Sequence, residues 1–482
     1  MRLELAIAAD DAGRVARLKP FAAERQNRGK PIPHRILWHD SPDRILAERG
    51  QVLSESQGIW RLQPLSPAAA GCPPAATPPV LDEAESRETI TADLPEPLIP
   101  IAAFQGRDVL YPLLGDNEPV TVTLRRGVVR AVAAEHPIAR VIVEGPPQGV
   151  RAVALLLANA ARVTVPRTSL AAEALALVGG VPFPDPGGGP GPPPDGCSAQ
   201  EALRHVLGQL THVLLHEAPR AADDQDGPEP VHQMRVAVRR MRSAISVFRM
   251  TLNSPQVAAV NQDLKDLAAR LGPTRDWDVF VTETIRAVTG AIPADPHLHR
   301  LVTAAEERRH ACHAALQAYL RSPAFRVLAV ELAWLAGTDA WGSAGDEPAP
   351  AVADFAPAAL RARWRKLLNA GKRIEELDVP ALHDLRLRAK RARYTAELFV
   401  PLYPGKAPRR FVRRLSRLQQ GLGLLNDGTV ARHLLDELGG PDGPHAHAVG
   451  LVLGFVAAHS ADIRPTVLKE WEKISELHSF WS

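Results

Sequence analysis

The 482-residue chain has few aromatic side chains, few cysteines and little net charge. Phe, Trp and Tyr make up 5% of the residues, so a surface that stacks many nucleic-acid bases is not expected. The three cysteines, Cys72, Cys197 and Cys312, are scattered and odd in number, which argues against a disulfide framework and favours a reducing compartment. No apolar run is long enough to span a bilayer, and the start MRLELAIAADDAGR lacks a signal-peptide pattern. We therefore expect a cytoplasmic protein that does not enter a membrane.

The positive charge is concentrated in the second half of the chain. Residues 1–196 carry a net charge of −2 and residues 197–482 carry +5, which together give the total of +3. Five arginines and no acidic residue lie between Val231 and Met250, and five more lie between Arg409 and Arg417. Local fields of this kind attract anions whatever the total charge is.

A chain of this length is expected to form at least two domains. The stretch VPFPDPGGGPGPPPDG at residues 181–196 cannot hold a regular element and predicts a linker. Residues 1–180 contain β-type segments, among them VTVTL and VVRAVAA as separate strands, together with a few helical segments, so an α+β domain is predicted. Residues 197–482 consist of amphipathic helical segments, one of them expected to break at Gly272-Pro273, so this half is predicted to be all-α.

The helical half contains an internal repeat. HQMRVAVRRMR begins at His232 and HDLRLRAKRAR begins at His383, an offset of 151 residues. LGPTRDWDV and LGLLNDGTV keep the same offset, which aligns their Leu-Gly pairs and one aspartate, Asp276 with Asp427. Two motifs in one register indicate a duplication, so we predict two similar helical bundles that pack as a pseudo-symmetric pair. Their expected limits are about residues 197–345 and about residues 346–482.

The repeated motif is predicted to place one histidine and three cations on a single helix face. Side chains at offsets 0, 3, 7 and 10 fall within roughly 80° of one another and form a ladder about 15 Å long. The planar fork of arginine can donate two hydrogen bonds to a phosphate, and a neighbouring polyanion favours charged histidine. One arginine-rich stretch alone is usually a solvated face, but the duplication favours a binding role. The two ladders are His232, Arg235, Arg239 and Arg242, and His383, Arg386, Lys390 and Arg393.

A third basic stretch follows in the second repeat. It contains Arg410, Arg413, Arg414 and Arg417, and its counterpart in the first repeat is not basic. Binding of a polyanion and an ordinary solvated surface both remain open for this stretch.

These motifs resemble the CHAD family, the conserved histidine α-helical domain, over about residues 197–480. The resemblance implies two four-helix bundles around a basic central pore, binding of inorganic polyphosphate and association with polyphosphate granules and their proteins. Lys390 keeps a positive charge where the family has arginine, and Glu397 is expected to end the second ladder. The resemblance implies these binding residues: His232, Arg235, Arg239, Arg240, Arg242, His383, Arg386, Lys390, Arg391 and Arg393.

Residues 1–180 resemble a degenerate CYTH domain, the triphosphate tunnel fold, through HRILWHDSPDRILAERGQVLSESQGIWRLQPL and ARVIVEG. The family begins with a Glu-x-Glu-x-Lys strand, and Arg2, Glu4 and Ala6 occupy those positions here. Ser54 and Ser56 stand where basic residues are expected. The loss of metal ligands and phosphate clamps removes charge neutralisation, on which phosphoryl transfer depends. The resemblance therefore implies a non-catalytic β-tunnel without metal or cofactor.

Three other functions remain open: a triphosphate-processing enzyme of the tunnel metalloenzyme class, a nucleic-acid-binding protein, and an adaptor that recruits a partner through the first half of the chain. Nucleic acid is disfavoured because aromatics are scarce near the ladders. His310-x-Cys312-His313 and His445-x-His447 are interpreted as structural residues and not as metal ligands.

Overall fold

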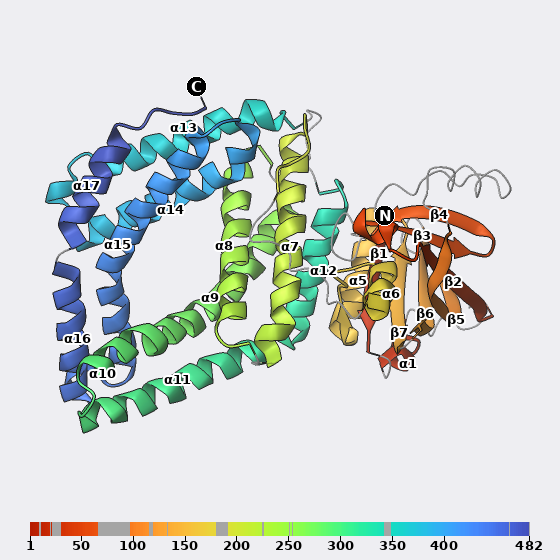
Figure 1. Cartoon of the computed structure of the whole chain (residues 1–482), viewed down its shortest axis with the longest axis horizontal. Coiled ribbons are helices and arrows are strands. Elements are labelled where there is room, and N and C mark those ends of the chain that lie inside the picture. The colour runs from red at the N-terminus through yellow and green to blue at the C-terminus, as the bar shows by residue number, and fades with distance from the viewer. Residues whose placement is uncertain are drawn as a thin grey trace. The chain divides into compact units, whose positions relative to one another are not determined.

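A computed structural model gives the fold of the chain (Figure 1). It describes residues 1–8, 11–19, 21, 30–65, 97–114, 119–132, 134–179, 191–223, 226–249, 251–252, 254–341, 349–461 and 463–481. Most of the predicted linker, residues 181–190, lies outside the described residues. The chain forms two compact units: Met1–Gly188, Leu207–His216 and Leu320–Trp341 in the first, and Gly189–Val206, Glu217–Tyr319 and Gly342–Ser482 in the second.

The first unit contains an eight-stranded sheet with the order β4-β3-β2-β5-β6-β7-β1-β8, in which neighbouring strands run antiparallel. The strands are β1 (Arg2–Ile7), β2 (Ile32–Asp40), β3 (Gln51–Ser56), β4 (Ile59–Pro64), β5 (Ile99–Leu114), β6 (Pro119–Ala131), β7 (Glu135–Glu144) and β8 (Val163–Thr164). The short helices α1 (Ala12–Val15) and α3 (Ile45–Glu48) join them. A sheet region followed by a helical region confirms the predicted α+β and all-α halves.

One strand prediction was wrong. VTVTL and VVRAVAA were expected as two strands but belong to the single strand β6. The pairing of β6 with β5 and β7 continues through Arg125, Arg126 and Gly127, so the interstrand hydrogen bonds extend the strand across the polar residues between the two apolar segments.

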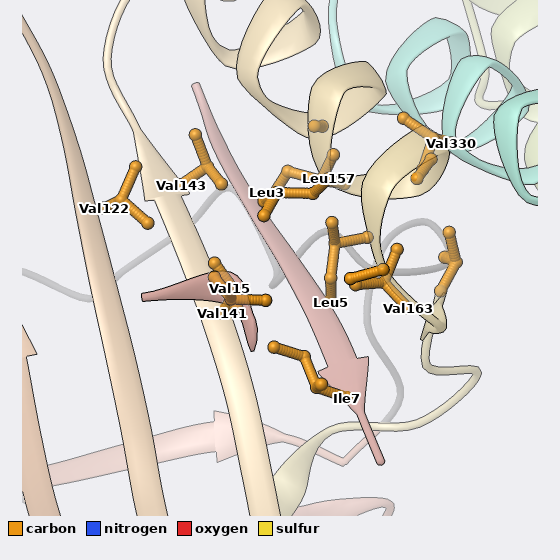
Figure 2. Packing of buried hydrophobic residues seen from close by; sticks show 14 of the residues in the cluster. Leu3, Leu5, Ile7, Val15, Val122, Val141, Val143, Leu157, Val163 and Val330 are labelled. Carbon is orange, nitrogen blue, oxygen red and sulfur yellow. The ribbon is translucent and has the colours of Figure 1, made fainter. Parts of the chain in front are cut away.

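The two faces of the sheet carry different helices. On one face, Leu3, Leu5 and Val141 pack against Leu157 of α5 (Pro147–Ala160), as Figure 2 shows. On the other face, a second apolar cluster packs against α6 (Leu170–Gly179). Alternate residues of a strand point to opposite faces, so the sheet is buried on both sides where these helices lie.

The first unit also includes α12 (Pro323–Gly337), a helix from the second half of the sequence that lies beside α5 (Figure 1). Val330 belongs to the same apolar cluster as β1 and α5 (Figure 2). The indole nitrogen of Trp334 donates a hydrogen bond to the carbonyl oxygen of Pro147 at 2.8 Å, and Arg151 Nε donates to Glu331 Oε2 at 2.8 Å. The compact unit built on the sheet is therefore not limited to residues 1–180. The domain limits of residues 1–180 and 197–482 remain predictions from the sequence.

In the described part of the second half of the chain, the regular elements are helices, apart from an isolated β-bridge between Ser198 and Ala351. The helices besides α12 are α7 (Ala199–Asp223), α8 (Glu229–Phe248), α9 (Pro255–Val279), the π-helix η3 (Phe280–Ile285), α10 (Arg286–Ala291), α11 (Pro296–Leu320), α13 (Val352–Ala370), η4 (Ile374–Glu376), α14 (Val379–Phe399), η5 (Val400–Leu402), α15 (Ala407–Glu437), η6 (Gly440–Asp442), α16 (Ala446–Ala461) and α17 (Ile463–Ser475).

The break expected at Gly272-Pro273 was wrong, because α9 continues through Pro273. Leu271, Thr274 and Trp277 around it are buried, so tertiary packing holds the helix where local propensity disfavours it.

By length and composition alone, the described helical residues of the stretch Ala446–Ser475 are numerous and apolar enough to cross a membrane. One such stretch is weak evidence, because a core helix meets the same criterion. Val449 and Val452 of this stretch are buried in an apolar cluster of the second unit.

Candidate anion-binding site

The first repeated motif lies on α8. Its apolar residues recur at helical spacing, and Met234, Val238 and Met241 are buried. Pro230 in the first turn supports the start of the helix, since the amide hydrogen that proline lacks has no partner there. The four ladder side chains are half-buried alongside this apolar stripe: His232, Arg235, Arg239 and Arg242.

The second motif lies on α14. The side chain of Asp378 caps the helix by accepting a hydrogen bond from the amide of Ala381 at 2.9 Å. The buried residues Leu385, Ala389 and Ala392 form the apolar stripe. On the ladder, Arg386, Lys390 and Arg393 are half-buried and His383 is exposed.

The two helices pack against each other at their C-terminal ends. Phe248 of α8 and Phe399 of α14, which stand at the same position of the two motifs, have ring centroids 6.0 Å apart. Both rings also contact Phe355 of α13, at 5.3 Å and 6.1 Å. This aromatic trio holds the two ladder-bearing helices together inside the second unit.

Tyr394 brings one arginine of each ladder together. The guanidinium carbon of Arg239 lies 4.9 Å from the centre of the Tyr394 ring, and that of Arg393 lies 4.7 Å from it. The Tyr394 hydroxyl and the Nε atoms of both arginines are buried and have no hydrogen-bond partner among the described residues. Buried polar atoms are normally satisfied, so the cluster holds hydrogen-bonding capacity that a ligand could use.

Lys390 shows how closely the positive charges approach one another. Burial, followed by the charges of Arg386, Arg239, Arg235 and Arg393, lowers the pKa of Lys390 to about 8. Two of these arginines come from α8 and two from α14 itself. Burial and Arg393 also hold the pKa of Arg239 below its usual value. The structure therefore brings the two ladders into one cationic cluster.

Two carboxylates form ion pairs with arginines of the ladders. Arg235 Nη1 lies 2.7 Å from Asp276 Oδ1, which joins the two motifs that the repeat keeps in register. Arg393 Nη1 lies 3.2 Å from Glu397 Oε1, in agreement with the expectation that Glu397 ends the second ladder. The side chain of Asp427 lies outside the described residues.

His232 differs from the arginines in charge. Burial lowers its pKa below the ordinary value, and the neighbouring charge of Arg275 acts in the same direction. The charged form of this histidine is therefore disfavoured, and the permanently charged part of the ladder on α8 begins at Arg235.

The remaining predicted residues are distributed over the second unit. Arg240 lies close enough to Arg239 to influence its pKa. Arg391 is exposed and influences the pKa of Arg363 on α13. In the third basic stretch, Arg414 Nη1 lies 3.5 Å from Glu470 Oε2 of α17, while three arginines are exposed: Arg410, Arg413 and Arg417. The ion pair of Arg414 favours a structural role for that residue.

Sequence reasoning did not single out Tyr394. The sequence feature that could have pointed to Tyr394 is its position directly after the second motif, where the first repeat has Ser243. A tyrosine that follows a run of arginines is compatible with many roles, and only the packing shows that both ladders meet at its ring.

Two arginines of the sheet, Arg125 and Arg140, form ion pairs. Arg125 donates to both oxygens of Asp108, at 3.0 Å from Nε and 2.8 Å from Nη2. Arg140 is buried and pairs with Glu4 at 3.2 Å and with Glu173 of α6. Among the described residues, no group of three or more His, Cys, Asp or Glu side chains is arranged to hold a metal ion.

The position of the two motifs agrees with a known family. Residues 204–436 match the family model of the CHAD domain, and both ladders lie within this match. This part of the chain is a CHAD domain. A crystal structure of the CHAD domain from the plant Ricinus communis is 27% identical, has a TM-score of 0.52, and covers 62% of this chain and 98% of that one.

Two relatives from Mycobacterium tuberculosis, the uncharacterized proteins MT2285 and Rv2226, are 32% identical over 212 residues. The match covers 43% of this chain and 40% of each relative, so it spans less than half the length of these proteins. The resemblance of residues 1–180 to a CYTH domain remains a prediction.

Proposed function

We propose that the CHAD domain binds inorganic polyphosphate along the cationic cluster that α8 and α14 form. The observation that supports this proposal best is that Arg239 and Arg393 meet at the ring of Tyr394. Lys390 lies close enough to both arginines for their charges to lower its pKa. Like charges held together at partly buried positions repel one another, and this raises the free energy of the ligand-free protein. An anion with closely spaced charges removes that repulsion and supplies acceptors for the buried donors.

Polyphosphate suits this cluster better than nucleic acid does. Non-specific binding of single-stranded nucleic acid uses aromatic rings on which bases stack. The aromatic ring at the centre of the cluster, Tyr394, is buried and already contacts the guanidinium groups of Arg239 and Arg393. A ligand that consists of phosphate groups alone has no bases to place and carries more charge per unit length.

The sheet of the first unit is proposed to have no catalytic role. Arg125 and Arg140 face carboxylates, so the charge of these two arginines is already neutralised. Ser56 donates its hydroxyl hydrogen to the carbonyl oxygen of Arg35 at 3.0 Å, where a phosphate-binding cation would be expected in the tunnel fold. In the cell, polyphosphate binding would place the protein in the cytoplasm on polyphosphate granules, with granule proteins as neighbours.

The test removes one cation from each ladder. In Arg239→Gln/Lys390→Gln, we expect binding of long-chain polyphosphate to weaken about 10–100-fold, because each charged hydrogen-bonding group contributes about 1.5–3 kcal/mol and the effects are not fully additive. The matched control is Arg361→Gln/Arg365→Gln, which removes two exposed cations from α13. Binding to wild type should weaken steeply with salt through counterion release.

Three results would contradict the proposal. They are an unchanged affinity of the ladder variant, a similar loss in the control, and binding of single- or double-stranded DNA as tight as that of polyphosphate. Release of phosphate from tripolyphosphate in the presence of magnesium would instead support the enzyme alternative.

A further inference from the structure

A pocket of about 620 Å³ lies in the second unit, between the C-terminal part of α8, α9 and α13. This volume falls in the range of small-molecule sites. Its lining includes four cations, and no carboxylate belongs to the described residues that line it. The polar lining residues are Arg242, Ser246, Arg249, Asn261, Arg363 and Lys366.

One cation of the pocket is hydrogen-bonded to a neighbouring helix. Arg363 Nη2 donates to the hydroxyl of Ser246 at 3.1 Å and also lies 3.4 Å from the Ser246 carbonyl oxygen. Arg242 Nε is buried and has no hydrogen-bond partner among the described residues. Apolar side chains such as Ile245 complete the walls, which strengthens electrostatic interactions inside the pocket.

A purely structural role explains only part of this arrangement. Cations at the C-terminal end of a helix interact favourably with its dipole and its free carbonyl groups. Arg249, the C-cap of α8, and Arg363, which contacts a carbonyl of the last turn, fit that role. Lys366 and Asn261 come from other helices and line the same pocket, so the concave cluster as a whole needs another explanation.

We infer that this pocket binds the terminal phosphate group of an oligophosphate or polyphosphate. A terminal group exposes three oxygens and carries more charge than an inner group of the chain, which matches four cations that line one pocket. Arg242 ends the ladder of α8 and also lines the pocket. Binding of a short oligophosphate in the pocket does not depend on the proposed function. The extension of a long chain from the pocket along the ladders does rest on it.

The test uses two ligands of equal phosphorus content in the full-length protein. Tripolyphosphate is linear and has two terminal groups, whereas trimetaphosphate is cyclic and has none. By calorimetry without divalent metal, wild type should bind tripolyphosphate at least about tenfold tighter than trimetaphosphate. Arg249→Gln/Lys366→Gln changes two exposed residues and should lose about tenfold in tripolyphosphate affinity and most of this preference.

A variant on the other side of α13 serves as the control. Arg361→Gln/Arg365→Gln removes the same charge from the opposite face of α13 and should bind tripolyphosphate as wild type does.

The inference is overturned if Arg249→Gln/Lys366→Gln binds tripolyphosphate like wild type, if wild type shows no preference for the linear ligand, or if the α13 control loses as much affinity. A different result would contradict the proposed function: Arg239→Gln/Lys390→Gln would bind long-chain polyphosphate with the affinity of wild type.

Discussion

Lys390 shows that the two ladders are not equivalent at the level of single residues. It stands at the position of Arg239 in the repeat, but an ammonium group loses its proton far more readily than a guanidinium group. Burial and four neighbouring arginines lower the pKa of Lys390 to about 8, within about one unit of neutral pH. The charge of the cationic cluster therefore depends on pH through this residue.

Polyphosphate affinity is expected to fall as pH rises from 7 to 9. Below a pH of about 8, Lys390 is mostly charged and can bind phosphate, and above it the free protein must take up a proton before that contact forms. The loss should approach about tenfold at pH 9, since bound polyphosphate raises the pKa of Lys390. Titration calorimetry in two buffers of different ionisation enthalpy measures both affinity and proton uptake near pH 8.

Lys390→Arg provides the control for this pH effect, because its guanidinium stays charged over the whole range. Wild-type affinity that is constant between pH 7 and 9, or proton release on binding, would show that Lys390 does not contact the ligand.

At the scale of elements, the aromatic trio determines how α8 and α14 meet. The rings of Phe248, Phe355 and Phe399 lie within 5.3–6.1 Å of one another and come from three helices. Aromatic pairs of this kind add to the free energy of burial, so they specify the crossing of the helices as well as stabilising it. The cationic cluster a few residues away depends on this crossing, because its residues come from both helices.

Phe248→Ala is expected to reduce the free energy of unfolding of the second unit by about 3–5 kcal/mol, because the Phe248 side chain is fully buried and leaves a cavity. Urea denaturation followed by circular dichroism measures the change. Leu424→Ala, at a side chain that is 50% exposed on α15, should cost less than about 1 kcal/mol. A loss below 1 kcal/mol in Phe248→Ala would mean that the trio does not hold the helices together.

At the scale of the whole molecule, the two halves of the sequence do not correspond to the two compact units. Helix α12 lies between two helices of the CHAD half in sequence, yet its Ala329, Val330 and Ala333 are buried in the core of the sheet unit. Arg151 of α5 pairs with Glu331 of the same helix. The sheet unit therefore needs part of the helical half to complete its core.

Val330→Asp tests this dependence in the full-length chain. A buried carboxylate without a partner costs several kcal/mol, so hydrogen exchange should become faster in β1 and α5, although both lie more than 150 residues away in the sequence. Ala324→Asp places the same group at an exposed position of α12 and should leave exchange unchanged. Unchanged protection of β1 in Val330→Asp would show that α12 is not part of that core.

Much of the site could be read from local spacing. The offsets of 3, 4 and 3 residues in both motifs predict one face of a helix, and half-buried Arg235, Arg239 and Arg242 lie beside the apolar stripe of α8. Helix spacing depends only on backbone geometry, which is the same in every protein. The same local rules failed at Pro273, where buried neighbours hold α9 intact against the preference of proline.

Three features follow from the sequence alone, because they are patterns within one element or between similar segments: the division into a sheet half and a helical half, the repeat at an offset of 151, and the two basic helix faces. Other features appear only in the folded chain. The ladders meet at Tyr394, Lys390 lies among four arginines, Arg363 and Lys366 line a pocket with α8, and α12 completes the core of the sheet unit. These contacts join segments far apart in the chain, and their free energy depends on burial and distance, which no local pattern specifies.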